Sequence, residues 1–93
     1  MPNARREERL SAALPVDLDA GTGVTLDVSA SGIFFETDVN YRPGSGITFT
    51  VQLDGPSGKL LMKCQGEIVR VEQRGEKVGV AVKIGASKFE PLD

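Results

Sequence analysis

Apolar and polar residues alternate along most of the 93-residue chain. A side-chain period of two is typical of a β-strand that buries one face and exposes the other. The alternation covers residues 10–18, 24–28, 47–53 and 78–84, and a shorter, more fully apolar run covers residues 33–37. These segments are therefore predicted to be strands, whereas no segment of useful length carries the period of a helix.

The alternation also predicts which side chains face the core. The first strand has its apolar residues at even positions and places Pro15 on the outward phase, which favours an edge or a local irregularity. Phe34 and Phe35 are adjacent, so one of them must face away from the core, where it could contact the N-terminal arm or a partner. In the second strand, three apolar residues are expected to share the inner face: Val24, Leu26 and Val28.

The longest predicted strand, residues 59–73, changes phase part-way along. Its even positions are apolar as far as Cys64, and its odd positions are apolar at Val69 and Val71. Because a strand cannot exchange its two faces without a bulge or a bend, we expect an irregularity between Gly66 and Ile68, with Gly66 as the natural place. A long strand bent in this way can serve two sides of a small barrel.

Turn residues separate about six strands, and 11 Gly and 5 Pro in a chain of this length suit many turns. Regularly spaced short strands favour an all-β barrel or sandwich, and closure would remove exposed edges. We expect one domain over residues 1–93. It would comprise a charged arm over 1–9, a barrel over 10–84, and a tail over 85–93 with at most a short C-terminal helix.

Composition narrows the classes of function. The chain has 11 Lys and Arg against 13 Asp and Glu, a formal net charge of -2, which argues against a binder of nucleic-acid polymers or membrane surfaces. It contains no His, which excludes His-based metal sites and Ser-His or Cys-His catalysis within this chain. No paired-carboxylate motif stands out, so we expect no enzyme, no metal and no cofactor.

The single cysteine and the absence of a long apolar run bear on location. Cys64 cannot form an internal disulfide, which fits a reducing compartment such as the cytoplasm. No run of 18 apolar residues exists, so no membrane insertion is expected. The first ten residues lack the apolar stretch of a secretory signal.

Two segments could carry chemistry. The first is the charged stretch before the first strand, with Arg5, Arg6 and Arg9 among glutamates. It is either a solvated charged arm or an anion clamp, because the planar guanidinium suits bidentate binding of phosphate and stacking on a base. Arg5 and Arg9 would share one face of a helical turn, or lie about 13 Å apart in an extended arm. Either spacing could grip two phosphates of one small ligand.

The second segment lies between the second and third predicted strands and contains Asp27, Ser29 and Gly32. It is either an ordinary turn, in which these residue types are common, or a binding loop. A carboxylate can accept hydrogen bonds from the N1-H and N2-H edge of guanine, and a serine hydroxyl can donate or accept. Gly32 would allow a close backbone approach or a positive φ.

Arg5-x-x-x-Arg9 followed by Asp27-x-Ser29-x-x-Gly32 resembles the signature of PilZ domains. The later runs over residues 66–70 and 78–82 are similar to the family's closing strand pair, so the resemblance covers nearly the whole chain. It implies a six-stranded antiparallel β-barrel that binds the bacterial second messenger cyclic di-GMP. Two departures are Ser31, where many members have Gly, and Ala81, which replaces a frequent Gly.

Carried over to this sequence, the resemblance implies that Arg5 and Arg9 hold phosphate and base, with Arg6 as a possible accessory. It implies that Asp27 and Ser29 hydrogen-bond the ligand and that Gly32 shapes the turn. The protein would then be a bacterial, cytoplasmic receptor or adaptor whose arm changes conformation on ligand binding and signals to a separate effector protein. The rival hypothesis is a PilZ-like protein–protein interaction barrel that does not bind the nucleotide.

Overall fold

The computed structural model of the chain describes residues 13–56 and 58–91, and every element in it is a strand. The strands form a closed barrel in the order β1-β2-β3-β6-β5-β4, and all neighbouring pairs are antiparallel. The expected all-β, six-stranded antiparallel barrel is therefore confirmed. The strands are β1 (Pro15–Leu18), β2 (Gly21–Val28), β3 (Gly32–Thr37), β4 (Gly46–Gly55), β5 (Gly58–Arg74) and β6 (Lys77–Pro91).

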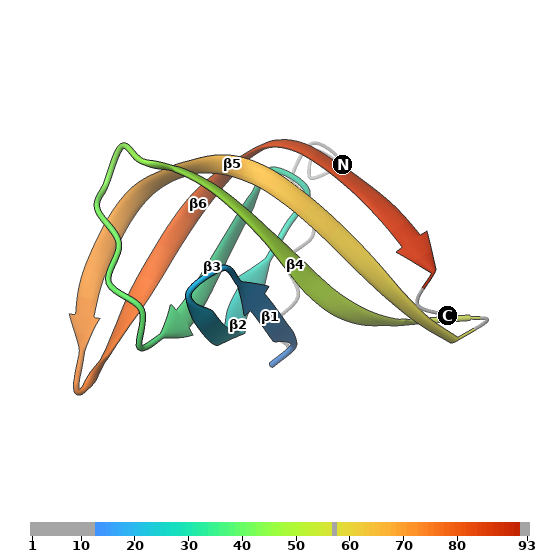
Figure 1. Cartoon of the computed structure of the whole chain (residues 1–93), viewed down its shortest axis with the longest axis horizontal. Coiled ribbons are helices and arrows are strands. Elements are labelled where there is room, and N and C mark those ends of the chain that lie inside the picture. Colours follow the sequence, from blue (N-terminus) through green and yellow to red (C-terminus); the bar gives the residue numbers. More distant parts are fainter. Residues whose placement is uncertain (1–12, 57, 92–93) are drawn as a thin grey trace, which may run out of the picture.

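The two longest strands, β5 and β6, arch over the whole molecule, and the shorter β1, β2 and β3 close the barrel beneath them (Figure 1). Inward-facing residues from all six strands form one hydrophobic core. Phe35 and Phe49 meet inside it with ring centroids 5.7 Å apart. Among the described residues no helix is long and apolar enough to cross a membrane.

Strand β1 confirms the predicted phase, because Val16 and Leu18 are buried and Pro15 is exposed. The strand begins at Pro15, four residues before its hairpin with β2, and its earlier predicted part, residues 10–12, lies outside the described residues. Leu14 packs against the core just before the strand begins.

The predicted facing of β2 was wrong. Val24 is 45% exposed and its neighbour Thr25 is buried, while Val28 faces the core as expected. The reason is a β-bulge between Thr25 and Asp27, which leaves Leu26 as an extra residue opposite β3. A polar residue can occupy the inner face because the hydroxyl of Thr25 accepts a hydrogen bond from the backbone N–H of Leu14.

Strands β5 and β6 carry two irregularities, which confirms that β5 changes phase but moves the change from Gly66 to Val69. Gly85 is an extra residue in β6, and Val69 is an extra residue in β5. Ile68 still faces the core, and Val69 is 54% exposed, so the two faces exchange at Val69 itself. Gly66 is required for a different reason: a Cβ there would collide with the backbone carbonyl of Lys83.

Strand β6 is longer than the alternation predicted. Residues 85–91, expected to form a tail or a single helical turn, continue the strand to Pro91. Each residue from Ala86 to Pro91 pairs with one from Gln65 back to Leu60, so the first half of β5 supplies the hydrogen-bonding partner. The sequence pattern missed this stretch because both of its faces are largely exposed, which removes the apolar alternation that marks a strand.

Candidate functional site

The turn between β2 and β3 is fixed by hydrogen bonds between Ser29 and Gly32. The backbone N–H of Ser29 donates to the carbonyl of Gly32 at 2.9 Å. The Ser29 hydroxyl accepts from the N–H of Gly32 and donates to its carbonyl, both at 3.2 Å. Because the N–H of Ile84 also donates to the carbonyl of Ser31, the turn is tied to β6 as well. Ser29 is thus a structural element of this loop.

Gly32 allows two backbone segments to approach closely, which is the first of the two roles expected for it. It does not have a positive φ, unlike Gly44, Gly58 and Gly75. A Cβ at position 32 would lie 3.2 Å from the carbonyl oxygen of Val82, closer than most side chains tolerate. The missing side chain therefore lets the start of β3 lie directly against β6.

Four residues form one row across the outer surface of the barrel. Asp27 of β2 pairs with Phe34 of β3, Phe34 pairs with Ala81 of β6, and Ala81 pairs with Arg70 of β5. Directly paired residues on antiparallel strands project from the same face of the sheet. Phe34 is the member of the phenylalanine pair that faces outward, and Phe35 is fully buried. The bulge in β2 matters here, because it brings Asp27 into register with Phe34.

A hollow of about 320 Å³ lies over this row. Ala81 has the smallest side chain of the row, so it leaves space between Phe34 and Arg70. The turn forms the other wall of the hollow. The lining residues are Asp27, Ser29, Ser31, Gly32, Ile33, Phe34, Arg70, Ala81 and Val82.

Two arginines from β5 lie over the ring of Phe34. The Arg70 Cζ is 5.3 Å from the ring centroid and the Arg74 Cζ is 5.8 Å from it, distances typical of cation–π contacts. Gly79 lies beneath the ring, and a Cβ there would lie 2.7 Å from Phe34 Cζ. The ring therefore lies between the arginines and Gly79, whose missing side chain leaves it room.

The sequence-predicted residues divide into two groups. The structure brings Asp27, Ser29 and Gly32 together at one hollow. Arg5, Arg6 and Arg9 lie outside the described residues. Sequence reasoning missed Arg70 and did not connect Phe34 with the turn. For Phe34, the signal in the sequence was that one of two adjacent phenylalanines must face outward. For Arg70 there was no such signal, because the bulge at Val69 sets its pairing with Ala81 and the sequence pattern does not show that bulge.

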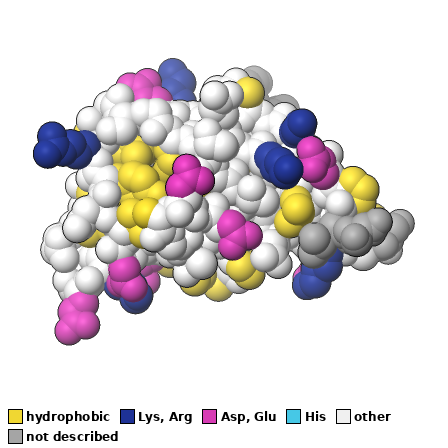
Figure 2. All heavy atoms as spheres, in the orientation of Figure 1, with side chains coloured by type: hydrophobic (Ala, Val, Ile, Leu, Met, Phe, Trp, Pro, Cys, Tyr) yellow, Lys and Arg dark blue, Asp and Glu magenta, His cyan; other side chains and the backbone are white. Residues whose placement is uncertain are grey.

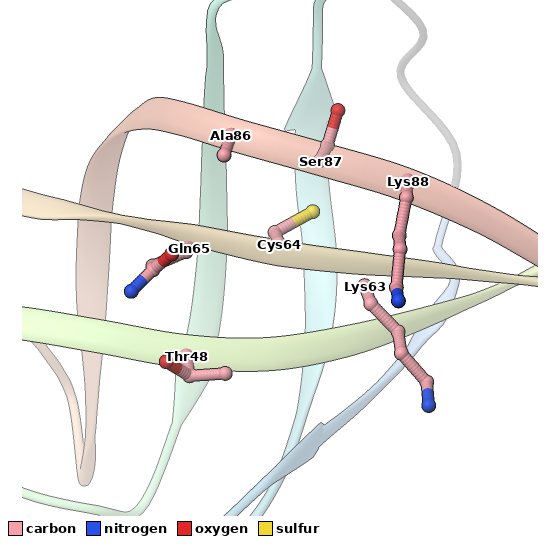
Figure 3. A pocket seen from close by; sticks show the side chains of 7 residues that line it. All are labelled: Thr48, Lys63, Cys64, Gln65, Ala86, Ser87 and Lys88. Atoms are coloured by element: carbon pink, nitrogen blue, oxygen red, sulfur yellow. The ribbon is translucent and has the colours of Figure 1, made fainter.

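A second hollow, of about 380 Å³, lies on the β4-β5-β6 sheet and is shown in Figure 3. Lys63 and Lys88 extend in the same direction from β5 and β6. Their ammonium groups lie 3.1 and 3.3 Å from the carboxylate of Glu90, which therefore partly neutralises both charges. Burial raises the pKa of the Cys64 thiol to about 11, so that group is protonated near neutral pH. This hollow offers neither a reactive nucleophile nor an aromatic platform.

Basic and acidic side chains are scattered over the face shown in Figure 2, and no field of one sign covers it. The charges near the β2–β3 turn, rather than an overall potential, therefore set the electrostatic environment of the hollow. A closed six-stranded barrel of this kind, with an acidic and hydroxyl-bearing turn beside an outer hollow, belongs to the class of small antiparallel β-barrels.

Comparison with known proteins identifies the family within that class. The PilZ domain pattern matches residues 3–90, and the chain therefore belongs to the PilZ domain family. The structure is similar to that of the Bacillus subtilis inhibitor of motility (MotI/DgrA), with a TM-score of 0.77 and 17% sequence identity. The match covers 88% of this chain and 43% of that chain, so this chain spans less than half of its structural relative. No curated protein matches the chain.

Proposed function

We propose that this barrel is a bacterial, cytoplasmic receptor for cyclic di-GMP that acts without catalysis. The observation that carries the proposal is the meeting of Asp27, Ser29 and Gly32 at one outer hollow in a PilZ domain. In this proposal Asp27 accepts hydrogen bonds from the N1-H and N2-H edge of a guanine. Ser29 and Gly32 hold the turn so that the carboxylate faces the base.

Arg5 and Arg9 would bind the phosphates, with Arg6 as an accessory. The ligand carries two phosphate charges, and bidentate arginine–phosphate contacts are among the strongest hydrogen bonds available to a side chain. The arm would become ordered on the ligand, and this ordering would cost conformational entropy that the charged contacts offset. The changed arm would then present a new surface to a separate effector protein.

Calorimetric titration with cyclic di-GMP tests the proposal directly. We expect the wild type to bind, and Arg9→Ala and the double variant Arg5→Ala/Arg9→Ala to lose most or all of the binding heat. Arg42→Ala removes an exposed arginine from the segment between β3 and β4 and serves as the matched control. No heat from the wild type at tens of micromolar ligand would reject the receptor hypothesis. Binding that survives the double variant would reject the assignment of the arm.

A second experiment follows the arm itself. Residues 1–12 contain several arginines, so trypsin can report on their accessibility. We expect cyclic di-GMP to slow cleavage after Arg5, Arg6 and Arg9 in the wild type but not in an Asp27→Ala variant. Equal cleavage rates with and without bound ligand would show that the arm does not cover it.

The rival hypothesis is a PilZ barrel that recognises a protein and does not bind the nucleotide. Phe89 and Val69 favour it, because their side chains are 59% and 54% exposed. The two hypotheses separate cleanly, since the rival predicts that neither cyclic di-GMP nor the arginine substitutions have any effect in the titration.

A further inference from the structure

The geometry points to Arg70 as an additional base-binding residue, which contacts the O6 and N7 edge of the guanine whose opposite edge is bound by Asp27. This inference rests on the proposed function, since it concerns the same hollow. The inference goes beyond the proposed function in two ways. It places one ligand-binding arginine on the barrel itself, independent of the arm, and it assigns to Arg70 the selection of guanine over adenine.

The position of the guanidinium follows from the row across the sheet. Arg70 and Asp27 are separated by three strand spacings, which corresponds to about 14 Å between backbones. The side chain of Arg70 reaches back over the small Ala81, and its Cζ lies 5.3 Å from the centre of the Phe34 ring. Since Phe34 pairs directly with Asp27, the positive and negative groups approach each other from opposite sides of the same hollow.

The ion pairs distinguish Arg70 from its neighbour Arg74. The Nε of Arg74 lies 3.2 Å from Glu36 and its Nη1 lies 3.5 Å from Glu72, so two carboxylates hold this side chain. For Arg70, Glu72 is the sole described carboxylate within ion-pair distance, and it approaches Nε at 3.5 Å. Glu72 is therefore shared between the two arginines, so the positive charge of Arg70 is less neutralised than that of Arg74. The side chain of Arg70 is 59% exposed and lines the hollow.

The two charges match the two edges of guanine. Guanine has donors at N1 and N2, which suit a carboxylate, and acceptors at O6 and N7, which suit the two-pronged guanidinium. Adenine has an acceptor at N1 and a donor at N6, so it would place like groups against both Asp27 and Arg70. Stacking on Phe34 would orient the guanidinium before the ligand arrives and reduce the entropy lost on binding.

The test is calorimetric titration of cyclic di-GMP and cyclic di-AMP into the full chain, as wild type, Arg70→Ala, Arg70→Lys and Arg74→Ala. We expect Arg70→Ala to weaken cyclic di-GMP binding by about 5- to 150-fold, the range for loss of one bidentate base contact. Arg70→Lys should be nearly as weak, because it keeps the charge but loses the planar fork. Arg74→Ala should remain close to the wild type. The ratio of the affinities for the two nucleotides should fall in both Arg70 variants.

Each remaining outcome has a definite meaning. If the wild type does not bind cyclic di-GMP, the proposed function fails, and this inference fails with it. If the wild type binds, Arg5→Ala/Arg9→Ala does not, and both Arg70 variants bind as the wild type does, then only the role of Arg70 is rejected. Equal losses in Arg70→Ala and Arg74→Ala, or weakened binding with unchanged base selectivity, would reduce Arg70 to a support for Phe34 and overturn the inference. Thermal unfolding of each variant checks that the barrel is intact. If Arg70→Ala does not fold, Arg70→Lys alone tests the role of Arg70.

Discussion

The backbone of Leu14 is joined to Thr25 by two hydrogen bonds. The N–H of Leu14 donates to the Thr25 hydroxyl at 2.9 Å, and the N–H of Thr25 donates to the Leu14 carbonyl at 3.0 Å. Leu14 directly precedes β1, and Thr25 borders the β2 bulge that brings Asp27 into register with Phe34. One threonine thus connects the residue just before β1 to the bulge that positions Asp27 beside the β2–β3 turn.

We therefore expect Thr25→Val to destabilise the protein by about 1–2 kcal/mol, because the shape is retained while the N–H of Leu14 loses its acceptor. Chemical denaturation measures the free energy of unfolding. Thr48→Val is the matched control, since Thr48 is exposed on β4 and tolerates the same change on the surface. A Thr25 variant as stable as the control would show that the hydroxyl does not hold the chain at this point.

Gly66 offers a second test of the fold. A Cβ at this position would overlap the backbone carbonyl of Lys83, and backbone atoms cannot move aside as a flexible side chain can. We expect Gly66→Ala to lower the free energy of unfolding by about 2–4 kcal/mol, in the range of overpacking and backbone strain. Gly46→Ala is the control, because the nearest atom to its added Cβ is 4.0 Å away. Similar stability of the two variants would contradict the tight β5–β6 contact at Gly66.

The thiol of Cys64 provides a prediction about pH. Burial raises its pKa from 9.0 to about 11 in the folded protein, and only 2% of the residue is exposed. At pH 8 we expect an alkylating reagent to label it far more slowly in the native protein than in denaturant. Between pH 9 and about 11 the unfolded thiol loses its proton while the folded one keeps it, so stability falls by an amount on the order of 2 kcal/mol.

Comparison with Cys64→Val separates this effect from the other groups that titrate in the same range. The wild type should lose more stability than the variant as the pH rises from 9 to 11, as measured by chemical denaturation. Parallel curves for the two proteins, or native labelling at the rate of an exposed thiol, would contradict the burial of Cys64.

The alternation within half-buried strands and the Gly- and Pro-rich turns were sufficient to predict an all-β barrel or sandwich, and the resemblance to PilZ domains selected the six-stranded barrel. The alternation was insufficient wherever a bulge changed the phase: Val24 was expected inside and Val69 was placed on the wrong face. Period-two reasoning assumes a regular ladder, and one extra residue reverses every later assignment. The site shows the same limit. Asp27, Ser29 and Gly32 are close in the chain and were found as a motif. Arg70 is far from them in the sequence and is aligned with Asp27 only by the pairing of β5 with β6, β6 with β3 and β3 with β2.

Gly79 tests the support beneath the proposed binding surface. It is buried in β6, and an added Cβ would lie 2.7 Å from both Phe34 Cζ and Arg74 Cδ. The ends of these side chains can move, so we expect Gly79→Ala to fold but to tilt Phe34 and the guanidinium above it. Affinity for cyclic di-GMP should fall about 5-fold or more, while the free energy of unfolding changes by about 1–2 kcal/mol. Titration and denaturation of the same samples distinguish the two effects.

Gly85→Ala, whose Cβ would meet nothing closer than 3.5 Å, is the control on the same strand. If Gly79→Ala binds the nucleotide as the wild type does, the Phe34 platform does not contribute to recognition.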